Sequence, residues 1–267
     1  MIIISLQISV LASGSSGNVI YVESEQKKVL IDAGLSGKQI NNRLRKINLS
    51  VKDLDAILLT HEHTDHIQGA GVLARRCKIP LYATAGTWQA AGDKLGKLKS
   101  EQQCVIDTTS FNLGDCQIKA FSIPHDAQEP VGYTITSCGA KVGVATDMGE
   151  VTDHVRAEIS DSDLVVLESN HDLEMLKIGP YPWSLKKRVM GNKGHLSNDA
   201  AGAEVVKLAK SSVSRILLAH LSKNNNVPEL AFLTIKNMLV EAGIKLEQDI
   251  RLDFAYQEEA TPLYQLG

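Results

Sequence analysis

A short apolar run that leads directly into a dense group of metal-ligating side chains constrains this chain more than any other feature. The run Ala56–Thr60 is expected to be a buried strand, and the next six residues, 61–66, are HEHTDH. Because side chains alternate along an extended chain, His61 and His63 should point the same way and share one metal ion. Asp65 and His66 follow the turn into the next helix and can face a second ion. A single histidine is more often an ordinary core or surface residue, but this cluster at a strand end predicts a metal site, and its ligands favour zinc or manganese.

Short apolar runs alternate with helical patterns along most of the chain, which indicates layered α/β architecture. Turn-like links such as Ser137–Ala140 predict hairpins among the crossovers, so a purely parallel doubly wound sheet is not expected. The expected strands are Ser5–Leu11, Val19–Val22, Lys28–Asp32, Ala56–Thr60, Leu81–Ala83, Cys116–Ile123, Gly132–Thr136, Lys141–Thr146, Leu164–Glu168, Arg215–Ala219 and Ile250–Phe254. The expected helices are Gly37–Ile47, Ile67–Cys77, Thr87–Gly92, Asp153–Ile159, Ser197–Ala209 and Pro228–Ala242. The stretch Asp172–Gly194 is the least regular and is expected to be an excursion from the core.

Size and charge narrow the class of protein. A length of 267 residues suffices for one α/β domain spanning residues 1–267. The formal net charge of −3 gives no general attraction to nucleic acid, so an anionic substrate would have to be drawn by a local patch or by bound metal. The oligomeric state stays open, a homo-oligomer included.

The cysteines and the apolar segments bear on location. Cys77, Cys104, Cys116 and Cys138 form no CxxC pair, and we expect four reduced thiols, buried as small apolar side chains, in a cytoplasmic protein. The apolar N-terminal segment lacks a basic n-region, so it is expected to be a strand and not a signal peptide. No apolar stretch is long enough to cross a membrane.

The HEHTDH motif resembles the HxHxDH signature of the metallo-β-lactamase superfamily, whose α/β fold is an αββα sandwich of two mixed β-sheets flanked by helices. The resemblance continues in the segments IDAG at 31–34, PH at 124–125, ATDMG at 145–149 and LAHLS at 218–222. It implies two divalent metal ions, zinc or manganese. It also implies the ligands: His61, His63 and His125 for the first ion, Asp65, His66 and His220 for the second, Asp147 between them, and Asp32 behind the histidine loop.

The resemblance implies hydrolysis by a water that the two cations activate, with Asp65 as the base. His195, in the segment GHLSNDAA, resembles the histidine motif of the RNase Z-like branch, where it donates a proton to the leaving group, and Glu168 resembles its carboxylate partner. The alternative for His195 is an exposed residue before a capped helix. His171 either lines the site or hydrogen-bonds within its own loop.

Three further segments could bind substrate. The Gly/Ser loop containing Ser13, Ser15 and Asn18 could form an anion-binding nest of backbone N–H groups, or it is only a hairpin turn. Trp183 beside Lys186, Lys187 and Arg188 could stack a base and grip phosphates. The alternative is a helix whose aromatic side is core and whose basic side is solvated. Lys223 and Asn224, shortly after His220, would add donors near the metals.

The combination of LASGSSGN, IDAGLSGK, HEHTDH, ESNHD, GHLSNDAA and AHLSKNNN resembles the YycJ/WalJ group, described as 5′→3′ DNA exonucleases. A metal-dependent phosphodiesterase or nuclease acting on DNA is therefore expected. The alternative is a small-molecule hydrolase of a cyclic phosphodiester, lactone or thioester, which the modest basic patch favours. Asp147 disfavours a periplasmic β-lactamase, and His63 disfavours an oxygen reductase of this fold. The complete ligand set disfavours a scaffold protein without catalysis.

Overall fold

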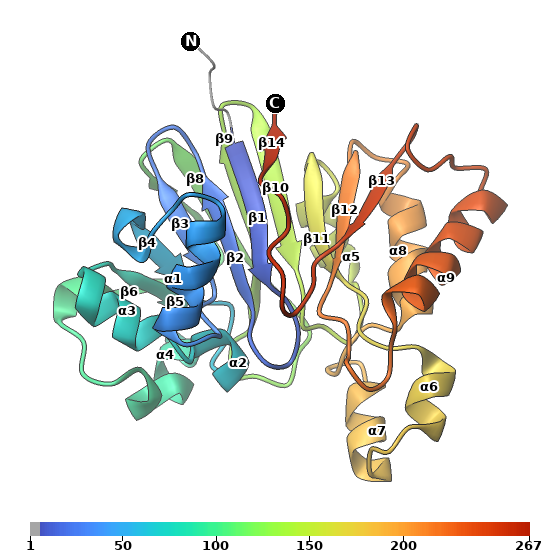
Figure 1. Ribbon diagram of the computed structural model, residues 1–267, viewed down its shortest axis with the longest axis horizontal. Coiled ribbons are helices and arrows are strands. Elements are labelled where there is room, and N and C mark those ends of the chain that lie inside the picture. The colour runs from blue at the N-terminus through green and yellow to red at the C-terminus, as the bar shows by residue number, and fades with distance from the viewer. Residues whose placement is uncertain (1–5) are drawn as a thin grey trace. The chain divides into compact units, whose positions relative to one another are not determined.

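The computed structural model describes residues 6–267, and its strands belong to two mixed β-sheets flanked by helices (Figure 1). This confirms the expected fold class. Contacts cluster the chain into two compact units. The first unit runs to Ser122 and adds Ala127–Ala140 and Ala255–Gly267, and the second holds Ile123–Asp126 and Lys141–Phe254. One domain over 1–267 stays a prediction. Among residues 6–267, no helix has both the length and the apolar character needed to span a membrane.

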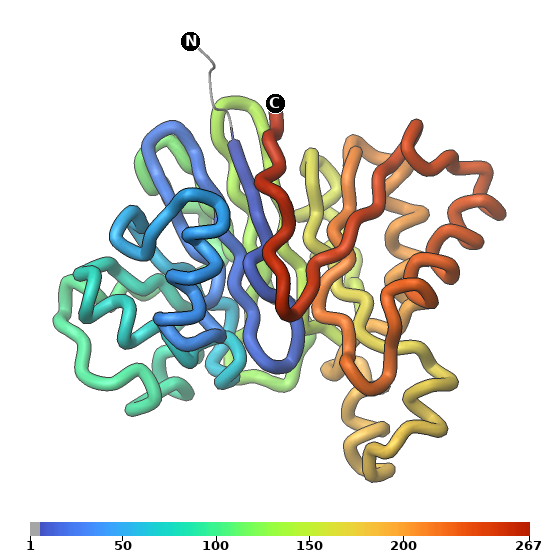
Figure 2. The backbone as a smooth tube through the Cα atoms, viewed as in Figure 1, coloured from blue at the N-terminus to red at the C-terminus, as the bar shows by residue number. Residues whose placement is uncertain are grey.

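The first unit is built on a seven-stranded sheet in the order β14-β1-β2-β3-β4-β5-β6. Its strands are β1 (Leu6–Ala12), β2 (Val19–Glu23), β3 (Lys28–Ile31), β4 (Ala56–Leu58), β5 (Leu81–Thr84), β6 (Gln103–Ile106) and β14 (Tyr264–Leu266). The neighbours from β14 to β3 are antiparallel, and those from β3 to β6 are parallel. The C-terminal segment lies along β1, with Tyr264 opposite Ile8 (Figure 2).

Helices and a second layer of strands cover this sheet. The helical segments are α1 (Gly37–Lys46), η1 (Val51–Asp53), α2 (Thr64–Ile67), α3 (Ala70–Cys77), α4 (Ala85–Ala91), η2 (Gly92–Leu95) and η3 (Ser100–Gln102). Helix α1 begins at Gly37 because Ser36 and Gln39 form a capping box. The antiparallel strands β7 (Ser110–Leu113), β8 (Cys116–Ser122) and β9 (Val131–Ser137) belong to the second sheet. The Tyr133 hydroxyl of β9 donates to the carbonyl of Leu59, which anchors the chain just before the histidine motif.

The second unit holds the parallel strands of the second sheet. These are β10 (Ala140–Ala145), β11 (Leu164–Glu168), β12 (Arg215–Ala219) and β13 (Arg251–Phe254). Its helices are α5 (Asp153–Ile159), α6 (Leu173–Ile178), α7 (Trp183–Val189), α8 (Asn198–Leu208) and α9 (Pro228–Glu241). Gly202 allows α8 and α9 to pack closely, since a Cβ there would lie 2.5 Å from Met238 Sδ. Candidate functional residues lie at the ends of three of these strands: Asp147 follows β10, Glu168 ends β11 and His220 follows β12.

Several expectations need correction. Strands β6, β7 and β14 and helices α6 and α7 were not predicted from the sequence. Because α6 and α7 lie within it, the stretch 172–194 is largely helical and not irregular. Asp172 starts α6 by accepting from the N–H of Met175. The expected helix Ile67–Cys77 is divided into α2 and α3, and residue 5 lies outside the described residues.

The cysteines are free, as predicted, but only Cys116 is buried. Cys77 and Cys104 are half-buried and Cys138 is exposed. Cys138 lies in the β9–β10 turn with φ 49°, where a tight reversal holds its side chain out of the core.

Candidate metal centre

The histidine motif gathers ligand atoms in the first unit. His61 Nε2 lies 3.0 Å from His63 Nδ1, and His66 Nε2 lies 3.6 Å from Asp65 Oδ2. The rings of His61 and His66 are buried, with centroids 4.0 Å apart. Three imidazoles and a carboxylate are the donor chemistry that zinc and manganese accept. These residues therefore fit a metal ion, as the spacing predicted.

Asp32 and Thr60 orient two of these rings from behind. The Asp32 carboxylate accepts from the N–H of Thr60 at 2.9 Å, from its hydroxyl at 2.9 Å and from His66 Nδ1 at 2.7 Å. Because the Thr60 hydroxyl donates to Asp32, its oxygen can accept from His61 Nδ1, 2.9 Å away. Both rings then keep the proton on Nδ1, which leaves Nε2 of each as the metal-binding atom. Burial raises the pKa of the Asp32 carboxyl above its usual value. His66 and Thr60 lower this pKa but do not outweigh the effect of burial.

The Gly/Ser loop packs directly on the motif. The N–H of Asn18 donates to the carbonyl of Asp65 at 2.8 Å, and a Cβ on Gly34 would lie 1.6 Å from that same oxygen. Asn18 Nδ2 lies 3.0 Å from His66 Nε2 and 3.4 Å from Asp65 Oδ2. Asn18 therefore supports the ligands, a function that the sequence analysis did not assign to it.

The same loop does not present an open anion nest. The N–H groups of Ser13, Gly14, Ser16, Gly17 and Asn18 all donate within the protein. Ser13 is buried, and Ser15 is exposed at the loop's tip. These amides hold the loop to its neighbours, which favours the alternative of a turn over the anion nest.

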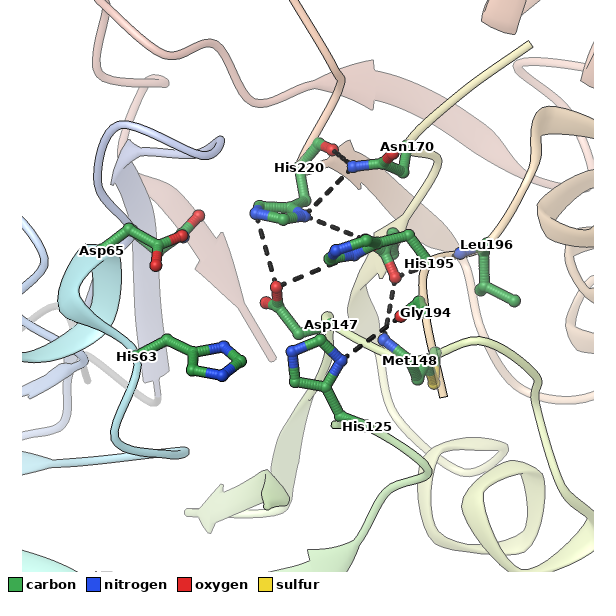
Figure 3. A network of polar contacts seen from close by, with 12 residues as sticks. His63, Asp65, His125, Asp147, Met148, Asn170, Gly194, His195, Leu196 and His220 are labelled. Atoms are coloured by element: carbon green, nitrogen blue, oxygen red, sulfur yellow. Dashed lines mark hydrogen bonds and ion pairs between the residues drawn. The ribbon is translucent and has the colours of Figure 1, made fainter. Parts of the chain in front are cut away.

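The second unit contributes another polar cluster, which Figure 3 shows. His220 Nε2 lies 3.4 Å from Asp147 Oδ1, and His195 Nδ1 lies 4.0 Å from the same oxygen. Asp147 and His220 have φ values of 59° and 56°, in the left-handed region that residues other than glycine rarely adopt. Each follows the end of its strand. Such strain persists where the surroundings impose it, and it is frequent at functional positions.

Glu168, at the end of β11, holds both histidines of this cluster. Its Oε1 accepts from His195 Nδ1 at 2.7 Å and from His220 Nδ1 at 2.9 Å. Its Oε2 accepts from the N–H of Met148 at 2.9 Å and from that of Leu196 at 3.3 Å. Burial raises the pKa of Glu168, but His195 and His220 outweigh it and lower the pKa to about 2. Glu168 is therefore an anion that orients imidazoles, and the side chain of His195 stays 19% exposed.

His125 follows β8 and a short link. Its Nδ1 lies 3.3 Å from the carbonyl of Gly194, so Nε2 is the atom left to bind a metal. Burial lowers the pKa of His125, which favours the neutral imidazole that a metal requires. Asp126 forms an ion pair with Arg188 and ties this segment to α7.

The basic triplet of α7 is not a uniform cationic face. Lys186 is buried and donates to the carbonyl of Lys177 at 2.6 Å, which disfavours its predicted contact with substrate. Arg188 is paired with Asp126. Trp183 is 58% exposed, so the aromatic side of α7 is not buried in the core either. Lys187 Nζ lies 5.8 Å from the centroid of the Trp183 ring.

The other candidate contacts divide between surface and interior. Lys223 and Asn224 are exposed, and Asn224 Nδ2 donates to the Tyr181 hydroxyl at 3.4 Å. His171 is buried, and neither ring nitrogen has a hydrogen-bond partner among residues 6–267. The ring therefore does not make the hydrogen bond within its own loop that was one of the two alternatives for His171. Burial lowers the pKa of His171 to about 4.

Sequence reasoning missed Thr60 and Asn170. Asn170 Nδ2 donates to the carbonyl of His220 at 2.8 Å and stabilises its strained backbone. Thr60 was treated only as the end of a strand. Its position next to the motif was a usable signal, because a hydroxyl there can relay a hydrogen bond between ligands.

A family model described as the beta-lactamase superfamily domain matches residues 27–221. The chain belongs to the metallo-β-lactamase superfamily. Exodeoxyribonuclease WalJ of Streptococcus pneumoniae is 41% identical over 266 residues, 98% of this chain and 99% of that protein. Exodeoxyribonuclease YycJ of Bacillus anthracis is 41% identical over 239 residues, 89% and 90% of the two chains. Within the superfamily, the chain is therefore a member of the WalJ/YycJ group.

A solved structure agrees with this assignment at the level of the fold. The metallo-beta-lactamase fold protein YhfI of Bacillus subtilis superposes with a TM-score of 0.72 at 17% identity, covering 96% of this chain and 99% of its own. Superfamily membership and the histidine and aspartate clusters together give the chain residues suited to binding metal.

Proposed function

We propose that this member of the superfamily is a metal-dependent exodeoxyribonuclease that hydrolyses DNA from the 5′ end. The observation that carries the proposal is its 41% identity to WalJ over nearly the whole of both chains. The donor clusters support it, because each gathers imidazole and carboxylate groups around one point. Action on DNA would place the protein in the cytoplasm, in accord with its free thiols.

Two divalent cations, zinc or manganese, are the proposed cofactors. His61, His63 and His125 would hold one ion, Asp65, His66 and His220 the other, and Asp147 would bridge them. When bound, such ions supply a water with a lowered pKa and neutralise charge on the scissile phosphate. Asp32 keeps the histidine loop in the ligand geometry through His66.

The remaining steps of the proposed reaction are proton transfers by side chains of this chain. Asp65 is the proposed acceptor of the attacking water's proton. His195 keeps Nδ1–H on Glu168, so its protonated Nε2 can donate to the oxygen that leaves as the P–O bond breaks. Glu168 stabilises the imidazolium, because its pKa of about 2 keeps it charged. His195 is exposed enough to meet a substrate, and Glu168 is not.

The test is digestion of DNA labelled at either end with zinc, manganese or magnesium present. Wild type should release label first from the 5′ end. Asp65→Ala should abolish release, and His154→Ala should behave as wild type because His154 is an exposed residue of α5. Intact 5′-labelled duplex and single strands with every metal would overturn the proposal.

A small-molecule hydrolase is the second candidate. The engagement of Lys186 and Arg188 within the protein favours it, because little of the expected basic patch is left for DNA. Turnover of bis-p-nitrophenyl phosphate without any DNA binding would support this candidate against the nuclease.

A further inference from the structure

A cavity of about 750 Å³ lies between α1 and α3 in the first unit, with η1 along its wall. We call it the α1–α3 cavity. Its lining includes the cationic side chains of Lys38, Arg45, Lys52 and Arg76 and no carboxylate. Four like charges around one hollow raise the local positive potential, whatever the net charge of the chain. The cavity is therefore suited to an anion.

None of these four cations forms an ion pair with a carboxylate among residues 6–267. Elsewhere in the same unit, Lys27 pairs with Asp55 and Lys28 with Glu23. An exposed cation that stands alone is usually only solvated. Four cations that surround one cavity without a carboxylate also act on one another. The four cations repel one another, and an anion bound among them would offset this repulsion.

The cavity is distinct from the histidine motif. Helix α1 follows the segment of Asp32, and α3 follows His66, so both helices begin near the ligands. At that end the helices are in contact, since a Cβ on Gly37 would lie 3.2 Å from Leu73 Cδ2. The four cations line the cavity along the length of the helices, and no metal ligand lines it.

We propose that the α1–α3 cavity binds the phosphate groups of a nucleic-acid strand outside the metal centre. The inference rests on the proposed function for the identity of that strand as DNA. Lys38 and Arg45 are seven residues apart on α1, about 10 Å at 1.5 Å per residue, so the charges can serve more than one phosphate. No aromatic side chain lines the cavity, so it lacks a surface on which a base would stack. Contacts to phosphates alone hold a strand without selecting sequence.

The first experiment measures binding of a labelled single-stranded oligonucleotide by anisotropy, in chelator, so that no cleavage occurs. The variant is Arg45→Ala/Arg76→Ala, and the matched control is Lys46→Ala/Lys236→Ala, which removes two exposed charges from helices without touching the cavity. The cavity variant should bind at least tenfold more weakly. Its log–log salt slope should fall by about 1.4, at about 0.7 per phosphate contact on a single strand. Equal effects of the two pairs, or none, would overturn the proposal.

The second experiment uses Cys77, which lines the cavity, and the exposed Cys138, which does not. The oligonucleotide should slow alkylation of Cys77, read by mass spectrometry, and leave the rate at Cys138 unchanged. Protection by a mononucleotide but not by the strand would overturn the proposal in favour of a small-ligand site. Neither readout involves hydrolysis, so protection of Cys77 together with intact DNA in the separate digestion test with every metal would overturn the proposed function and leave the phosphate site standing. Thermal unfolding confirms that each variant is folded.

Discussion

Replacing Asp32 should separate the stability of the histidine loop from its affinity for metal. In Asp32→Ala, the N–H of Thr60 and the Nδ1–H of His66 both lose a buried acceptor. An unsatisfied buried donor costs about 1–3 kcal/mol, so the two together should lower the free energy of unfolding by about 4 kcal/mol. Asp32 has a φ of 62°, which alanine adopts no more readily than aspartate, so the substitution relieves no backbone strain.

Asp32→Asn should behave differently, because its amide oxygen can still accept from Thr60. The amide NH₂ would then face His66 Nδ1, so that ring must accept there and carry its proton on Nε2. A protonated Nε2 cannot bind a metal ion. We therefore expect a stability loss of about 1 kcal/mol but a metal affinity about 10- to 100-fold weaker, the usual cost of losing such an orienting group.

The assays are urea unfolding of metal-free protein and competition for zinc against a chromophoric chelator. Asp32→Ala should lose more stability than Asp32→Asn, whereas Asp32→Asn should bind zinc more weakly than wild type when the affinity is measured on folded protein. If Asp32→Asn binds zinc like wild type, the assignment of the His66 proton is wrong. If Asp32→Ala unfolds like wild type, the buried donors find other partners.

Three further predictions follow from single residues. His171 has its pKa lowered to about 4, so its neutral form contributes stability that is complete above about pH 6.5 and is lost as the pH falls toward 4. Relative to His171→Leu, wild type should therefore lose about 2 kcal/mol between pH 7.5 and 5.0 in urea unfolding, and parallel pH profiles would contradict this. Lys187→Ala should weaken DNA binding and lower the salt slope by about 0.7–0.9, whereas an unchanged slope would make Lys187 a solvated residue. Asp147→Gly should unfold at higher urea than Asp147→Ala, because only glycine accepts φ 59° without strain of about 1–2 kcal/mol. The opposite order would show that the strain at residue 147 is negligible.

Much of the fold was predictable because its central strands are short, apolar and buried on both faces. Strands β11 and β12 were predicted with their exact ends. Strands β6 and β7 were missed because half-exposed residues alternate along them and give little apolar signal. Strand β14 has only three residues and gains its place by pairing with β1, a partner more than 250 residues away in sequence.

The gathering of the candidate ligands was predictable because they lie at strand ends, whereas the contacts of the α7 cations were not. Lys186, Lys187 and Arg188 are adjacent and look equivalent in the sequence. Their directions differ by about 100° per residue around the helix, so one cation reaches a carbonyl of the preceding helix, one the solvent and one a carboxylate. These partners depend on where α6 and the segment of Asp126 pack against α7, and nothing in the triplet itself records that packing.

Glu168 connects two functions that the sequence analysis treated separately. The same carboxylate oxygen accepts from His220, a proposed ligand, and from His195, the proposed proton donor. Because one anion fixes the Nδ1 proton of both rings, it would leave Nε2 of His220 for the proposed metal ion and Nε2 of His195 for the leaving oxygen of the proposed reaction. A change at Glu168 must therefore disturb metal binding and proton donation together, whereas a change at His195 leaves the bond between Glu168 and His220 in place. The two steps can therefore be separated at either histidine but not at Glu168.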